Sequence, residues 1–162
     1  MDKLPRQALP LLVLYLDNQK PIESKTKFQK IMFMIEHEIE ELNKYFDQKH
    51  SWEAYHFGPF SDSLLEDLEL LSVWGLIDIR EEYSEDEAIL SEHVIYKITE
   101  KGKEIVKKKI LPKLPSKVLT KIAEIKRKYT EMPILAVVKE VYEKYPVFAE
   151  KSKIKEKVLR TK

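Results

Sequence analysis

Residues 76–102 read LIDIREEYSEDEAILSEHVIYKITEKG, and this stretch decides the fold. Residues 76–80 and 94–98 are rich in β-branched and aromatic side chains, which favour strands. The acidic run between them suits the tip of a long hairpin. Thr99 follows the second strand as the N-cap of a helix. Gly102 lies in the first turn of that helix, where a residue without a Cβ lets helix and strand approach closely.

The residues before this hairpin predict three helices. Apolar side chains recur at helical spacing over residues 9–16, 28–42 and 64–71. A capping box at Thr26, of the form T-x-x-Q, predicts the start of the second helix. The third helix is expected to begin near Ser61 or Ser63 and to end at Gly75, which is typical of a C-cap.

The aromatic segment 52–60 separates the second and third predicted helices. Residues 52–57 read as a short extended segment that Gly58 and Pro59 bring to an end. We expect this segment to be a core strand between the two helices, because alternate residues of such a strand are buried. Trp74, beside Gly75, is likewise expected in the core.

Two further apolar stripes follow the hairpin, over residues 118–129 and 134–142, and predict helices. The order helix, helix, helix, hairpin, helix is that of a winged helix-turn-helix domain. We therefore expect an α+β, mainly helical protein. Its winged helix-turn-helix domain is expected to span residues 1–111, and a helical extension is expected to span residues 112–148. Residues 149–162 form a basic tail that is expected to be poorly ordered. The extension is expected to pack on the domain or on a second copy.

Several short motifs resemble known families. YKITEKG, residues 96–102, is similar to the strand-to-helix junction that follows the wing in many winged-helix regulators. TKFQKI at 26–31, YHFGPFS at 55–61 and residues 68–77 resemble the YwgA-like winged-helix proteins and, more distantly, the Panacea-type antitoxin domain. The resemblance covers residues 4–103, and weakly 133–154. It implies a non-enzymatic regulator, DNA-associated in the first group and toxin-neutralising in the second, and it carries over no functional residue.

Composition excludes several classes of protein. The 162 residues include no Cys and only three Gly, far apart at 58, 75 and 102. Disulfide scaffolds, thiolate zinc sites, P-loops and dinucleotide fingerprints are therefore excluded. No apolar run approaches the ~20 residues of a spanning helix, so we expect a cytoplasmic protein without a membrane partner. The bias toward Lys and Glu resembles that of proteins from hot environments.

Four histidines, at positions 37, 50, 56 and 93, are the candidate acid–base groups or metal ligands. None falls in a metalloprotease or nucleophile motif. Each is better explained as a structural residue that makes one hydrogen bond. We therefore expect no catalytic residue, no metal and no cofactor, and we expect that the protein is not an enzyme.

The charge is divided sharply along the chain. Residues 1–99 contain 10 basic and 20 acidic residues, a formal charge of −10, whereas residues 100–162 contain 19 basic and 8 acidic residues, a charge of +11. A winged-helix protein usually presents its third helix and wing to DNA. Here both are acidic and would repel phosphates, so the usual docking mode is not expected.

Two function hypotheses follow from this division. In the first, a transcription-regulator-like protein contacts DNA phosphates through basic residues. These are Lys25, Lys27, Lys30, Lys101, Lys103, Lys107, Lys108, Lys109, Lys126, Arg127 and Lys128. In the alternative, an antitoxin-type module offers its acidic third helix and wing to a basic protein. The helix residues are Asp62, Glu66, Asp67 and Glu69. The basic helices are equally well explained as a solvated face, and a homodimer that pairs the opposed halves is also expected.

Overall fold

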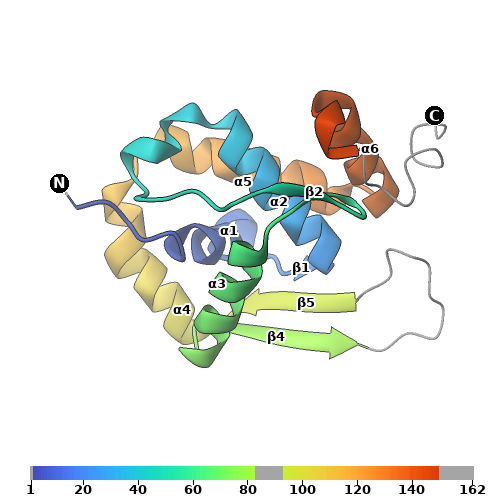
Figure 1. The fold of residues 1–162 in the computed structure, drawn as a ribbon. Coiled ribbons are helices and arrows are strands. Elements are labelled where there is room, and N and C mark those ends of the chain that lie inside the picture. The colour runs from blue at the N-terminus through green and yellow to red at the C-terminus, as the bar shows by residue number, and fades with distance from the viewer. Residues whose placement is uncertain (1, 83–92, 150–162) are drawn as a thin grey trace.

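The computed structural model describes residues 2–82 and 93–149. The protein is α+β and mainly helical, with a small antiparallel sheet at one side of the helices (Figure 1). The sheet has the order β1-β5-β4, where β1 is Ile22–Glu23, β4 is Ile77–Glu82 and β5 is His93–Ile98. In the register, Ile77 pairs with Ile98 and Glu82 with His93, so the predicted hairpin is confirmed.

Three helices precede the hairpin and one follows it, in the predicted order. They are α1 (Ala8–Gln19), α2 (Lys25–Glu38), α3 (Asp62–Val73) and α4 (Glu100–Ile105). Shorter helical turns follow α2 at Glu40–Lys44 and α4 at Val106–Ile110 and Leu111–Lys113. The apolar stripe predicted over residues 28–42 is therefore divided, because the chain leaves helical geometry at Ile39.

Side-chain caps fix where the helices begin. The Thr99 hydroxyl accepts a hydrogen bond from the Gly102 N–H at 3.0 Å, as predicted. A Cβ on Gly102 would collide with the Leu76 carbonyl, which confirms the close approach. The prediction of a capping box at Thr26 is wrong, because the Ser24 hydroxyl caps α2 by accepting a hydrogen bond from the Lys27 N–H. Of the two serines considered for α3, Ser61 is the cap.

Helices α5 (Ser116–Glu131) and α6 (Ile134–Lys144) pack against the first part of the chain. Helix α5 contacts α1 and α2, and α6 contacts α2. Val118 and Ile122 of α5 are fully buried in the same hydrophobic core as Leu12 of α1 and Ile31 of α2. The extension thus packs on its own chain. A last helical turn spans Pro146–Ala149. Residues 150–162 of the predicted tail and residues 83–92 at the predicted hairpin tip lie outside the described residues.

The aromatic segment does not form a core strand. Residues Glu53–Tyr55 (β2) and Gly58–Phe60 (β3) instead form a short hairpin. Its first strand lies at the surface, where Tyr55 is 46% exposed, while Gly58 and Pro59 of β3 are buried. Gly58, with a φ of +98°, turns the chain back after β2, so that no single strand runs through residues 52–60. Trp74 is also not in the core: it is 47% exposed, because it ends α3 on the side that faces solvent. None of the helices within the described ranges is long and apolar enough to cross a bilayer.

Candidate functional site

One side of α3 faces solvent along the whole helix, beside the β4–β5 hairpin (Figure 1). Its exposed residues, called here the α3 outer face, are Asp62, Glu66, Glu69, Leu70, Val73 and Trp74. The N-terminal half of this face is acidic and the C-terminal end is apolar. Val73 is 82% exposed, Trp74 47% and Leu70 40%, which makes them most of the large exposed apolar side chains among the described residues.

The opposite side of α3 holds the helix on the core. Leu64, Leu68 and Leu71 are buried at the helical spacing that the sequence predicted. Gly75, with a φ of +77°, reverses the chain directly after the helix and leads into β4. This inner anchoring leaves the α3 outer face without intramolecular cover from the described residues.

Asp67 does not belong to the outer face. The prediction that Asp67 meets a partner is wrong, because its side chain is completely buried. Its carboxylate accepts hydrogen bonds from Arg6 Nε at 2.7 Å and Arg6 Nη2 at 2.9 Å. Gln7 Nε2 donates to the same carboxylate at 3.0 Å. Such a bidentate arginine contact is geometrically specific and fixes α3 to the N-terminal segment.

His50 joins Asp67 to a second buried carboxylate, Glu36 of α2. Its Nε2 lies 2.7 Å from Asp67 Oδ2, and its Nδ1 lies 2.6 Å from Glu36 Oε2. Glu36 also accepts hydrogen bonds from the His50 backbone N–H and from Trp52 Nε1. We call Arg6, Glu36, His50 and Asp67 the buried ionic cluster. It joins the N-terminal segment, α2, the 47–52 loop and α3.

The geometry of the cluster requires a charged imidazole. Because both ring nitrogens of His50 face carboxylate oxygens, both donate, which only the imidazolium does. Burial alone would lower the pKa of His50, but its hydrogen bonds with Asp67 and Glu36 outweigh burial and raise that pKa. Burial likewise opposes ionisation of Asp67, yet His50 and Arg6 bring the pKa of Asp67 down to about 2. The four formal charges cancel, and the cluster holds the segments that contribute to it together.

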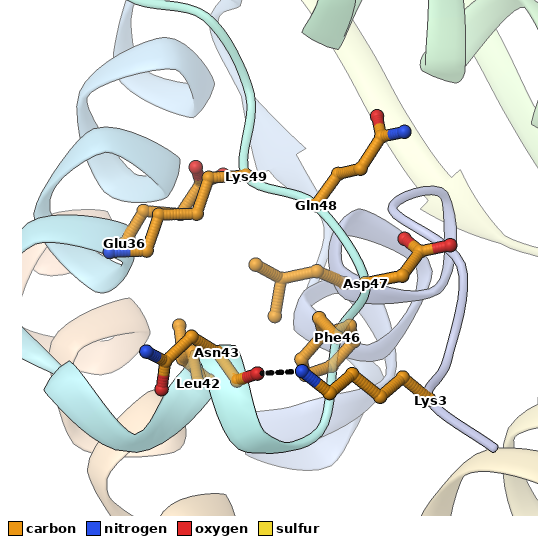
Figure 2. A pocket seen from close by; sticks show the side chains of 9 residues that line it. Lys3, Glu36, Leu42, Asn43, Phe46, Asp47, Gln48 and Lys49 are labelled. Carbon is orange, nitrogen blue, oxygen red and sulfur yellow. Dashed lines mark hydrogen bonds between the residues drawn. The ribbon is translucent and has the colours of Figure 1, made fainter.

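A hollow of about 240 Å³ lies beside this cluster (Figure 2). Leu42 and Phe46 form apolar parts of its lining, and Glu36 is the buried carboxylate among the lining residues. The oxygens of Glu36 are committed to His50 and Trp52, as described above. Lys3 Nζ donates to the Asn43 carbonyl at 2.8 Å. The hollow assembles no nucleophile with a base, so we assign it no catalytic role.

Two of the predicted phosphate-binding lysines lie in the interior. Lys30 is 2% exposed, and its ammonium donates to the Pro59 carbonyl at 3.1 Å. Lys126 is completely buried and donates to the carbonyls of Leu14 and Leu16. Burial lowers the pKa of Lys30 to about 7 and that of Lys126 to about 8. The prediction that these two residues bind phosphates is wrong, since their ammonium groups do not reach the surface.

Three more basic residues are engaged with the protein itself. Lys27 donates to the carbonyls of Thr130 and Met132 at the end of α5, at 3.3 Å and 2.7 Å. Arg127 and Lys128 form ion pairs with carboxylates of the same chain, at 3.0 Å and 3.1 Å. These contacts attach α5 to its neighbours and reduce the positive charge that the helix presents outward.

The basic residues of α4 and the turn after it fall into two groups. Lys101 donates to the Trp74 carbonyl at 2.9 Å, while Lys103 and Lys108 pair with Glu100 and Glu104 of α4. Lys107 and Lys109, like Lys25 at the start of α2, are exposed or half-buried and make no ion pair with a described residue. The predicted basic surface is therefore divided between neutralised and unpaired lysines.

The buried ionic cluster was not predicted from the sequence. His50 was considered only as a structural histidine, and Arg6 and Glu36 were not singled out. Only a fold that brings positions 6, 36, 50 and 67 together reveals them. Among the described residues, no group of three or more His, Asp or Glu side chains is arranged to hold a metal ion.

Comparisons with known proteins return nothing for this chain: no family model, no curated protein and no solved structure matches it. The geometry above is therefore the basis on which a function is proposed.

Proposed function

We propose that this chain is a non-enzymatic, cytoplasmic regulatory module of the winged helix-turn-helix type that acts through protein contact on the α3 outer face. Three helices followed by a hairpin, with the short strand β1 beside β5, support the winged arrangement. In this arrangement α3 occupies the place of a recognition helix. Its acidic residues and the exposed Glu81 and Glu82 of β4 oppose a polyanion and favour a partner with basic groups.

The observation that carries the proposal is the exposure of Leu70, Val73 and Trp74 together at one end of α3. Contiguous exposed apolar side chains rimmed by polar residues mark interaction surfaces in folded proteins. Tryptophan is also enriched among the residues that dominate binding energy. The partner is therefore expected to present an apolar centre with basic groups beside it.

Photo-crosslinking in the cells that express the protein tests this proposal. Val73 is replaced by the photoreactive residue p-benzoylphenylalanine, and Val147, 59% exposed on a different element, is replaced in the same way as the matched control. We expect a protein adduct, identified by mass spectrometry, from position 73 and not from position 147. Adducts with nucleic acid at position 73, or equal yields at both positions, would refute the proposal.

A second candidate function rests on the unpaired lysines. Lys107 and Lys109 are exposed on the segment after α4 and make no ion pair with a described residue. Lysine acts as a point charge, so such residues favour phosphate contacts without base recognition. In this candidate function the protein binds duplex DNA weakly, with an affinity that falls steeply as salt increases.

A further inference from the structure

We infer that the α3 outer face binds a second copy of this chain about a two-fold axis that passes near Val73. This inference rests on the proposed function, because it assumes that the face is a docking surface. It adds the identity of the occupant.

The side chains along the α3 outer face follow a fixed order of charge. Glu66 and Glu69 precede Val73 by seven and four residues, which places them about 10 Å and 6 Å away at 1.5 Å per residue. On the other side of Val73, past the last turn of α3, the Lys101 ammonium lies 2.9 Å from the Trp74 carbonyl. The acidic residues of the α3 outer face thus precede its apolar end, and the Lys101 ammonium lies next to that end.

A two-fold axis converts this order into complementarity. Rotation about an axis through the apolar part places Val73 against its own copy, and it brings the acidic end of one α3 onto the basic end of the other. Each interface then contains the pair Glu69–Lys101 twice. Because one surface of the chain carries both acidic and basic groups, a second copy of the same chain provides the opposite charge for each of them.

The groups that would pair are available for this role. Glu66 and Glu69 are exposed and form no ion pair with a described residue. Lys101 is exposed, and its ammonium has three donors, of which the Trp74 carbonyl occupies one. The formal charge of the whole chain is only +1, so two copies approach without strong repulsion.

Sedimentation velocity of the full chain over a concentration series tests the inference. We expect a monomer–dimer equilibrium whose dissociation constant rises at least tenfold in Val73→Glu, because the substitution places two carboxylates at the axis. Val147→Glu is the matched control, since it adds the same charge at an exposed valine on another element, and it should leave the equilibrium unchanged.

A charge exchange gives the sharper test. Glu69→Lys and Lys101→Glu should each weaken the dimer, and the double variant should restore it, because both copies of the pair in the interface are then reversed in charge. Circular dichroism melting of every variant checks that it is folded. A wild-type chain that stays monomeric at several hundred micromolar, a dimer unaffected by Val73→Glu, or a double variant as weak as the single ones overturns the inference.

The crosslinking experiment separates this inference from the proposed function. Adducts of position 73 with a different protein, from a chain that is monomeric in solution, would leave the proposed function standing and remove the second copy. Adducts of position 73 with the same chain support both. No protein adduct at position 73 would remove both.

Discussion

Replacing His50 with glutamine is expected to destabilise the protein by about 3–5 kcal/mol near pH 6. In the wild-type protein, the positive charges of Arg6 and His50 balance Glu36 and Asp67 inside the buried ionic cluster. Without the imidazolium, the buried carboxylates of Glu36 and Asp67 keep Arg6 as the remaining cation of the cluster, and of the two carboxylates Arg6 hydrogen-bonds only to Asp67. Removing one partner of a buried ion pair typically costs this amount, against a total stability of about 5–15 kcal/mol for a domain.

The same loss should depend on pH in a defined direction. Burial disfavours the charged ring, but the hydrogen bonds with Asp67 and Glu36 raise the pKa of His50 above 6.5. A base whose pKa is raised on folding stabilises the folded state fully below pH 6.5 and loses that contribution as the pH rises through the folded-state pKa. The difference in unfolding free energy between wild type and His50→Gln should therefore be largest near pH 6 and shrink toward pH 9.

Urea denaturation of both proteins at pH 6, 7, 8 and 9 measures this difference. His37→Gln is the control, because His37 lies on α2 and its Nδ1 contacts only a backbone oxygen, that of Phe33. A nuclear magnetic resonance titration of the His50 ring protons gives the pKa directly. A wild-type advantage over His50→Gln that is constant from pH 6 to pH 9 would refute the assignment of a charged His50.

Three further outcomes are expected. Gly102→Ala should destabilise the protein by about 1–3 kcal/mol in urea denaturation, because a Cβ there meets the Leu76 carbonyl, and an unchanged midpoint would contradict this packing. Lys30 has a pKa of about 7 in the folded protein and 10.5 in the unfolded chain, so it takes up a proton on unfolding, and the free energy of unfolding of the wild type should rise between pH 7 and pH 10. Lys30→Met should remove this rise in urea denaturation. Equal slopes for both proteins would show that Lys30 is not the source. Replacing Lys107 and Lys109 together with glutamate should change stability by less than about 0.5 kcal/mol and abolish retardation of random duplex DNA at low salt, and retained retardation would exclude these residues as the contact.

Local rules predicted most of the fold. The hairpin of residues 76–98 follows from β-branched and aromatic residues around an acidic run, and Thr99 and Gly102 determine the helix after it. These features depend on neighbours in the sequence, so no knowledge of tertiary contacts was needed. Where two local solutions competed, as with Ser24 and Thr26 at the start of α2, the sequence pattern favoured the wrong one.

The candidate site depends on contacts between distant residues. A lysine inside a basic run was counted as surface charge, but Lys30 and Lys126 turn inward because backbone carbonyls at chain bends accept their hydrogen bonds. Asp67 was grouped with Glu66 and Glu69 on composition. The helical turn separates them, since Asp67 points toward Arg6 and His50 while the glutamates point to solvent. A count of charged residues does not show whether a side chain points into the core or toward solvent.

Lys27 and Lys126 tie the two parts of the chain together in both directions. The ammonium group of Lys27 in α2 donates to a backbone carbonyl at the end of α5, and the ammonium group of Lys126 in α5 donates to a backbone carbonyl at the end of α1. A gene fragment that encodes only the first four helices would leave an ammonium group without its acceptors and a helix terminus without its donor. We therefore expect the two parts of the chain to fold as one unit, because each supplies hydrogen-bond donors to backbone carbonyls of the other.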